Sequence, residues 1–140
     1  MPKEEKIEYH QLSVGYEFPP ASHRLDAAMV TAYCLAVEEA SDLYHGLVPP
    51  MAVAAYAMAA LAEHINMPPG TIHVSQELEF LKELTIEDTI TSYPKVIRNQ
   101  ERGRLHMLAV ELNVFNQHQQ AVMTGKTSFI LPQQDEGKGA

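Results

Sequence analysis

The sequence predicts an α+β fold in which an antiparallel β-sheet wraps around one long, buried, apolar helix. Two observations carry this prediction. No charged residue occurs from Gly46 to Ala62, and this uncharged run is too short to cross a bilayer. Beyond Gly70, apolar and polar residues alternate with the period of β-strands. A sheet with one dry face and a helix that is apolar all round bury their apolar surfaces most simply against each other.

An amphipathic helix is predicted over residues 26–39. Asp26 is a suitable N-cap, because its side chain can accept a hydrogen bond from the first turn. Met29, Tyr33 and Val37, with Val30 and Cys34 beside them, repeat at the three- and four-residue spacing that places side chains on one helix face. We expect this helix to pack by that face only.

The central helix is predicted over residues 50–66. Pro49 and Pro50 suit a helix entrance, because the N–H groups of a first turn need no partner within the helix. The segment Pro68-Pro69-Gly70 marks the end. A surface helix would carry a charged stripe, so we expect this one to be buried on all sides.

Four strands are predicted after the central helix, separated by short polar turns with the spacing of consecutive hairpins. An antiparallel meander is the expected result. Pro94 removes one ladder hydrogen bond, so its strand is predicted to lie at an edge or to be bulged there. A further extended piece around residues 16–24 is a candidate fifth strand. The four predicted strands cover residues 72–84, 89–100, 104–116 and 120–131.

The chain of 140 residues is expected to form a single domain over residues 12–132, because no segment within it has the composition of a long linker. Residues 1–11 are polar and aperiodic, which predicts a flexible N-terminus. Residues 133–140 have the same character, which predicts a disordered tail.

The amino-acid composition disfavours some classes of binding partner. Eighteen acidic and ten basic residues give a formal net charge of -8, which repels nucleic acid and anionic membranes. The single cysteine, Cys34, cannot form an intramolecular disulfide and is expected to be a small core residue. The charged first residues lack the apolar stretch of a signal peptide, so a cytoplasmic location is expected.

Three segments resemble the MaoC-like branch of the hotdog fold, and the resemblance covers residues 12–132. They are the helix entrance Gly46–Met51, the segment Pro69–His73 that opens the sheet, and Gln76–Thr89, which is similar to the family's pattern of an aromatic, a basic residue and an acidic turn. The Pro-Pro entrance is most similar to the degenerate N-terminal halves of double-hotdog dehydratases.

This resemblance implies an acyl-thioester hydratase or dehydratase of fatty acid metabolism, which adds water reversibly to an enoyl thioester. Active members carry a segment Ser-x-Asp-x-Asn-Pro-x-His, which Ala40–Gly46 resembles in shortened form. The resemblance implies that Asp42 activates water and that His45 donates a proton, although His45 lies three residues after Asp42 and not five. In the alternative without catalysis, Asp42 stabilises a turn and His45 is a polar loop residue.

The helix entrance of active members reads Ala-His-Gly, whereas this chain has Pro49 and Pro50. Proline has no N–H to offer an oxyanion, so Met51 and Ala52 are the predicted donors. A second hypothesis is therefore a non-catalytic hotdog subunit that binds an acyl thioester or completes a hetero-oligomeric dehydratase. A thioesterase ranks lowest, because Glu63 is the only acid in the predicted helix and lies far from its N-terminus.

No cofactor is implied beyond the carrier of the substrate, which is coenzyme A or acyl carrier protein. Arg98, Arg102 and Arg104 cluster around one predicted hairpin tip, where they are candidates to bind the phosphates of coenzyme A or simply a solvated surface. The histidines lack metal-ligand spacing, so no metal site is predicted. The resemblance implies a homodimer or a hetero-oligomer with another hotdog chain, because open sheet edges are otherwise liabilities.

Overall fold

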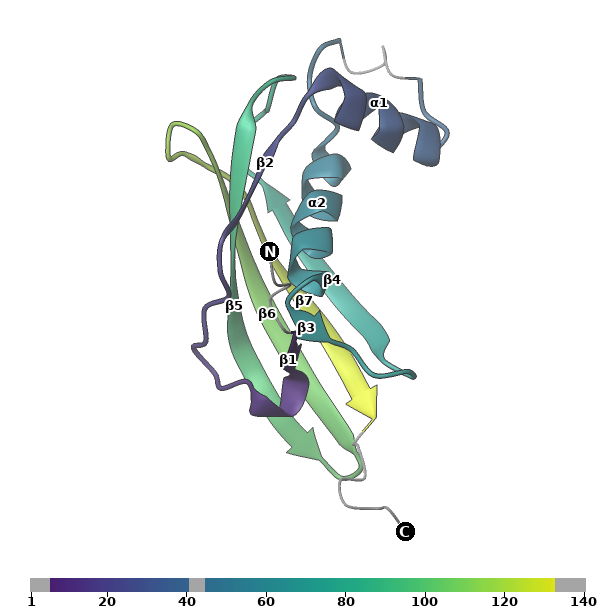
Figure 1. Ribbon diagram of the computed structural model, residues 1–140, viewed down its shortest axis with the longest axis vertical. Coiled ribbons are helices and arrows are strands. Elements are labelled where there is room, and N and C mark those ends of the chain that lie inside the picture. The colour runs from purple at the N-terminus through teal and green to yellow at the C-terminus, as the bar shows by residue number, and fades with distance from the viewer. Residues whose placement is uncertain (1–5, 41–44, 133–140) are drawn as a thin grey trace.

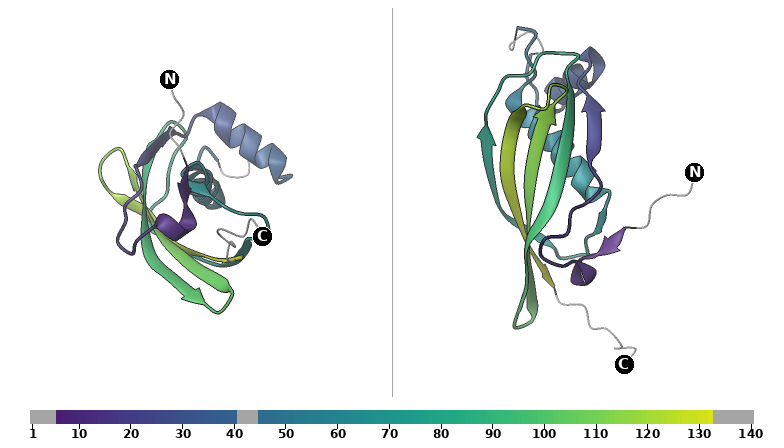
Figure 2. Two further views of the ribbon diagram at one scale, coloured as in Figure 1. Left: turned by 60° about the horizontal axis from the view of Figure 1, so that its bottom comes forward. Right: turned by 90° about the vertical axis from the view of Figure 1, so that its left-hand side faces the viewer.

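A curved five-stranded antiparallel sheet holds one helix in its concave face (Figure 1; Figure 2, left). The computed structural model describes residues 6–40 and 45–132. The strand order is β2-β5-β6-β7-β4, so the predicted α+β hotdog architecture is confirmed. The elements are β1 (Ile7–Glu8), η1 (Tyr9–Gln11), β2 (Ala21–Arg24), α1 (Ala27–Ala36), α2 (Pro50–Ala62), β3 (Ile65–Asn66), β4 (Ile72–Phe80), β5 (Thr89–Arg102), β6 (Leu105–Asn116) and β7 (Ala121–Pro132).

The pairing of the four long strands differs from a simple meander. β5 pairs with β6 and β6 with β7 as antiparallel neighbours, as predicted. β4, however, pairs with β7 and not with β5, so the first expected hairpin is wrong. The sheet curls around α2 and places β4 and β5 on opposite sides of the helix (Figure 1). Residues 81–88 therefore cross from one side of the fold to the other.

The first helix begins where the sequence predicts it to begin. The Asp26 side chain accepts a hydrogen bond from the Met29 N–H at 2.8 Å, which confirms the N-cap. The helix ends at Ala36, three residues before the predicted end, because Glu38 adopts a positive φ of 59°. Its buried residues are Val30 and Cys34.

The central helix α2 is buried on one face only, which corrects the expectation of a helix buried on all sides. Ala52, Val53 and Leu61 are among the buried residues, and they face the sheet core formed by β5, β6 and β7. The opposite face is exposed, because the sheet reaches around only part of the helix. This exposed stripe consists of Met51, Ala55, Ala59 and Ala62.

The N-terminal segment is part of the fold within the described residues. β1 pairs in parallel with β3, and the Tyr9 side chain is 2% exposed. The Tyr9 hydroxyl donates to the carbonyl oxygen of Pro132 at 2.9 Å. The expectation of a flexible segment over residues 1–11 therefore does not hold for Ile7–Gln11, because a buried aromatic ring anchors that part. Residues 1–5 and the predicted tail 133–140 lie outside the described residues.

No helix among the described residues is long and apolar enough to span a membrane.

Candidate functional site

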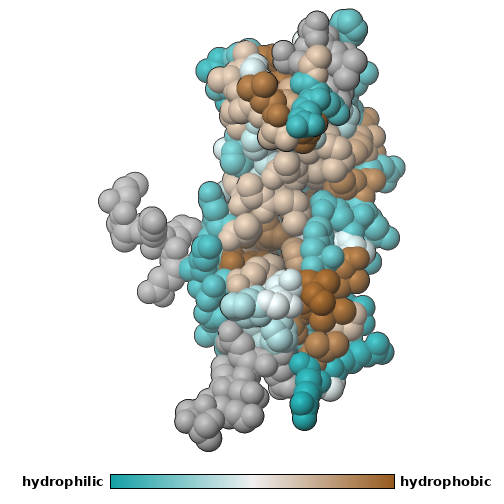
Figure 3. All heavy atoms as spheres, turned by 90° about the vertical axis from the view of Figure 1, so that its right-hand side faces the viewer, coloured by the Kyte–Doolittle hydropathy of each residue, from teal (hydrophilic) through white to brown (hydrophobic). Residues whose placement is uncertain are grey.

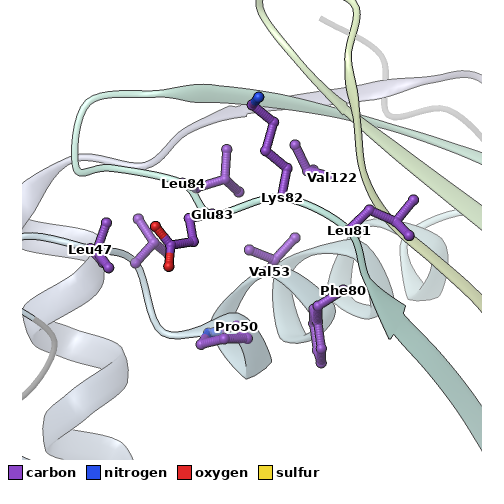
Figure 4. Close-up of a pocket in the computed structure, with 10 residues that line it drawn as sticks. Leu47, Pro50, Val53, Phe80, Leu81, Lys82, Glu83, Leu84 and Val122 are labelled. Carbon is purple, nitrogen blue, oxygen red and sulfur yellow. The ribbon is translucent and has the colours of Figure 1, made fainter.

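The candidate site is an apolar pocket at the entrance of α2 (Figure 4). Its volume is about 380 Å³, and it lies between the first turns of α2, the end of β4 and the loop 81–88. Eight of its ten lining residues are apolar, which suits an acyl chain better than a polar ligand. The lining residues are Leu47, Val48, Pro50, Val53, Phe80, Leu81, Lys82, Glu83, Leu84 and Val122.

One wall of the pocket is a short ladder between the helix entrance and the loop. The Val48 N–H donates to the Leu84 carbonyl oxygen at 2.8 Å, and the Ile86 N–H donates to the Gly46 carbonyl oxygen at 3.1 Å. Between them, Leu47 and Thr85 form an isolated antiparallel bridge. The loop is therefore held against the residues that lead into α2.

Asp88 fixes the same loop from the other side. Its Oδ2 atom accepts hydrogen bonds from the Thr85 N–H at 2.8 Å and the Thr85 hydroxyl at 3.1 Å. Its Oδ1 atom accepts a hydrogen bond from the Gln117 amide at 2.7 Å. Burial raises the pKa of Asp88, but these hydrogen bonds outweigh it and leave the pKa below its ordinary value. The ionised carboxylate is thus the form that holds the loop.

The β2–α1 junction supports this loop from a third direction. The Leu25 N–H donates to the Asp88 carbonyl oxygen at 2.8 Å, and the Glu87 N–H donates to the Leu25 carbonyl oxygen at 2.7 Å. Arg24 and Glu87 also form an exposed ion pair. Three neighbouring segments therefore hold the residues that line the pocket.

The helix entrance offers few N–H donors. Pro49 is the N-cap and Pro50 the first helical residue, so neither supplies an N–H. The Ala52 N–H already donates to the Pro49 carbonyl oxygen at 2.9 Å, and Ala52 is fully buried. Ala52 is therefore not supported as an oxyanion donor. Within residues 6–40 and 45–132, the Met51 N–H finds no acceptor, so Met51 stays the predicted donor.

Two charged side chains, Lys82 and Glu83, line the pocket, and neither was among the site residues predicted from the sequence. Figure 4 shows the Glu83 carboxylate directed toward Leu47, while Lys82 extends away from the other lining side chains. Both residues are exposed. The sequence signal that includes both residues is the aromatic, basic and acidic pattern in Gln76–Thr89, and that pattern indicates the fold rather than the site.

The predicted acid–base pair is only partly described. Asp42 lies outside the described residues. His45 is exposed, with a positive φ of 51°, and directly precedes the segment 46–48 that pairs with the loop. It does not line the pocket. The catalytic roles of Asp42 and His45 therefore stay predictions.

The arginine cluster lies far from the pocket within the chain. Arg98 and Arg102 belong to β5, and Arg104 follows in the turn to β6. Figure 1 places this turn at the lower end of the sheet, whereas α2 begins at the upper end. The expected phosphate contacts from Arg98, Arg102 and Arg104 therefore do not meet the helix entrance of the same chain. A β-hairpin of this length carries its tip away from the site.

Other candidate groups are remote from the pocket or do not form a site. Glu63 is the C-cap of α2, at the opposite end of the helix from the pocket. Over the described part of the chain, no three His, Cys, Asp or Glu side chains are placed to hold a metal ion.

Comparison with known proteins identifies a family. Residues 13–125 match the sequence profile of the family described as FAS1-like, dehydratase domain region. No curated protein sequence matches the chain significantly.

Solved structures share the fold at low sequence identity. The R-hydratase PhaJ1 from Pseudomonas aeruginosa, in its unliganded form, is 19% identical with a TM-score of 0.76, and the match covers 92% of this chain and 88% of that protein. The (R)-hydratase from A. caviae involved in PHA biosynthesis is 22% identical with a TM-score of 0.74, and covers 87% and 98% respectively. The C-terminally truncated HadBC complex, a 3R-hydroxyacyl-ACP dehydratase from Mycobacterium tuberculosis, is 16% identical with a TM-score of 0.64, and covers 84% and 96%.

Proposed function

Because this chain belongs to the FAS1-like dehydratase family, of the MaoC-like hotdog type, we propose that it adds water reversibly to the double bond of an enoyl thioester. The observation that carries this proposal is the apolar pocket beside the N-terminus of α2. Its apolar wall suits the acyl chain, and the helix N-terminus suits the thioester oxygen, on which negative charge develops during the reaction.

The reaction needs one group that accepts a proton from water and one that protonates the α carbon. We assign the first role to Asp42 and the second to His45. Water loses a proton to the carboxylate as its oxygen bonds to the β carbon, and the imidazolium then protonates the α carbon. The Met51 N–H stabilises the enolate-like oxygen between these steps. No cofactor takes part beyond the carrier of the acyl group.

Lys82 is the proposed contact for the phosphate of the carrier, which is coenzyme A or acyl carrier protein. It is the cation that lines the pocket, whereas the arginine cluster lies at the other end of the sheet. Its ammonium group extends outward from the pocket in Figure 4, on the side where a carrier would remain in solvent. A single exposed lysine contributes a modest attraction, so we expect Lys82 to affect binding more than turnover.

A second candidate function is a subunit that binds the acyl thioester without reacting with it. Pro49 and Pro50 favour this function, because they remove two donors from the helix entrance and Ala52 is already paired with Pro49. Such a chain would complete the tunnel of a catalytic hotdog partner. The HadBC complex is an assembly of this fold, which supports the same kind of assembly here.

Either function fits an oligomer. The exposed stripe of α2 is apolar, and β4 is an edge strand with Ile72 59% and Val74 50% exposed. Figure 3 shows a band of moderately hydrophobic residues running lengthwise down this face, with strongly hydrophobic residues beside its lower part. Contiguous exposed apolar surface is typical of an interaction site. We propose a homodimer or a hetero-oligomer with another hotdog chain.

The deciding experiment combines an assay with a measurement of solution mass. The purified chain is mixed with an enoyl thioester of coenzyme A, and loss of the conjugated absorbance is followed while light scattering gives the oligomeric state. A dimer that turns over, and loses turnover in the Asp42→Asn variant, supports the hydratase. A folded chain without turnover that binds a non-hydrolysable acyl thioester supports the second function. Retained activity in folded Asp42→Asn overturns the role of Asp42.

A further inference from the structure

Two buried side-chain atoms lack hydrogen-bond partners among the described residues. They are Nε2 of His23 on β2 and Oγ of Ser92 on β5. Ser92 is 1% exposed. Leaving a buried polar atom unpaired costs about 1–3 kcal/mol, and native proteins satisfy nearly all such atoms with protein groups or ordered water.

The two residues are diagonal neighbours on the same face of the sheet. β2 and β5 pair so that His23 lies opposite Ile90 and Ala21 lies opposite Ser92. Ile90 and Ser92 are both buried, so this is the inner face that packs on α2. The His23 ring stacks on the Tyr56 ring of α2, with centroids 6.0 Å apart and an interplanar angle of 28°. Both side chains therefore project into the space between β2, β5 and α2.

The outer face of the same strand pair is arranged differently. There Ser22 and Thr91 are directly opposite, and their hydroxyl groups are hydrogen-bonded at 2.8 Å. On the inner face, His23 and Ser92 are diagonal neighbours and not directly opposite each other. Diagonal neighbours are about 7–8 Å apart at the backbone. A single water with two hydrogen bonds of about 2.8 Å spans a gap that a direct hydrogen bond cannot.

We propose that the inner face binds one buried water molecule between His23 Nε2 and Ser92 Oγ. The serine hydroxyl donates to the water oxygen, and one water O–H donates to the imidazole nitrogen. The Tyr56 ring, which stacks on His23, lies beside this site, and the Tyr56 hydroxyl donates to the Met29 carbonyl oxygen at 2.9 Å and so ties α2 to α1.

The water has a structural consequence for the pocket. β2 has only four residues, and its last residue, Arg24, pairs with Glu87 of the pocket loop. Leu25, which follows, exchanges backbone hydrogen bonds with that loop. A water that joins β2 to β5 therefore also holds the strand that supports residues 81–88. This site is independent of whether the chain is a hydratase.

Substitution of Ser92 shows whether a bound water pairs the two buried atoms or whether both atoms are unpaired. If the hydroxyl is unpaired, Ser92→Ala removes a buried polar group without losing a hydrogen bond. The midpoint of thermal unfolding then stays constant or rises. If the hydroxyl holds the water, Ser92→Ala lowers the midpoint by about 3 °C, the shift for roughly 1 kcal/mol in a domain of this size. Ser22→Ala, on the exposed face of the same strand pair, is the matched control and should shift the midpoint less.

A double-mutant cycle identifies the partner. His23→Phe keeps a ring against Tyr56 and removes Nε2, so the double variant with Ser92→Ala should lose less than the sum of the two single shifts. A crystal structure of the full chain provides the direct measurement. A density peak within hydrogen-bond distance of both atoms supports the proposal. No peak, or an unchanged or raised midpoint in Ser92→Ala, overturns it.

Discussion

The backbone N–H of Ala52 donates to the carbonyl oxygen of Pro49 at 2.9 Å, across the first turn of α2. This hydrogen bond occupies the N–H of the third helical residue. Pro49 and Pro50, the two residues before Met51, have no N–H to offer. The entrance thus differs from an ordinary helix N-terminus, where several N–H groups are available to an anion.

Replacing Pro50 by alanine restores an N–H at this entrance. Pro50 is exposed, so Pro50→Ala should fold normally. If the chain hydrates enoyl thioesters, we expect the turnover number to rise by about tenfold, because one oxyanion donor is worth at least that much. Pro69→Ala, also exposed but beyond the other end of α2, serves as the control. An unchanged turnover number in folded Pro50→Ala would contradict a role for this entrance.

Substitutions of Lys82 and of the arginine cluster should affect carrier binding differently. Lys82→Ala should raise KM for a coenzyme A thioester by about threefold with little change in kcat, because an exposed charge contributes modestly to binding. Arg102→Ala removes a charge at the far hairpin and should leave KM constant if one chain forms the whole site. Steady-state kinetics at two salt concentrations tests both, since added salt should reduce the Lys82 effect. A larger effect from Arg102 would place the carrier across two subunits.

Buried His106 should make the protein less stable in mild acid. Its Nε2 donates to Asn99 Oδ1, and the Asn99 amide donates to the Tyr9 carbonyl oxygen at 3.1 Å. Burial lowers the pKa of His106, which Glu101 opposes and His10 reinforces. As the pH falls below about 6.5, the unfolded chain binds this proton before the folded one does, so the free energy of unfolding decreases.

Chemical denaturation at a series of pH values tests this effect. His106→Gln keeps a donor toward Asn99 and should show a flatter dependence between about pH 7 and pH 5. Equal slopes for the original chain and His106→Gln would rule out His106 as the titrating group.

Asp88→Asn should loosen the pocket loop. The amide has one acceptor oxygen where the carboxylate uses two, so one donor from Thr85 or Gln117 loses its partner. We expect a loss of about 1–2 kcal/mol in the free energy of unfolding at neutral pH. The lowered pKa of Asp88 means that the difference from the original chain shrinks as the pH falls through and below about 4, where the original carboxylate also becomes protonated. A constant difference at every pH would show that ionisation of Asp88 is irrelevant.

Gly125→Ala should disturb the edge strand. A Cβ at position 125 would lie 2.8 Å from the Glu77 carbonyl oxygen and 3.0 Å from a Leu78 methyl group, so β4 would have to move away from β7. We expect a loss of about 1–3 kcal/mol in stability, measured by denaturant unfolding. Ser128→Ala, on the same strand, is the control and should be near neutral. Because β4 borders the proposed interface, Gly125→Ala should also weaken self-association.

The sequence alone determined the fold class, the N-cap at Asp26 and the existence of the central helix. These features are local: an apolar run, a proline entrance and an alternating pattern express themselves within a few residues. The helix limits were less accurate, because Glu38 and Ile65 adopt conformations that the surrounding sheet and turns select.

The tertiary structure decided which residues meet. Pairing of β4 with β7 carried loop 81–88 across the fold, so Lys82 and Glu83 reached the entrance of α2. The same topology placed Arg98 and its neighbours at the far end of the sheet. Such contacts depend on strand order and on the direction in which the sheet curls, and periodicity along the chain contains neither. The family likeness predicted the architecture, but the composition of the site depended on that long-range packing.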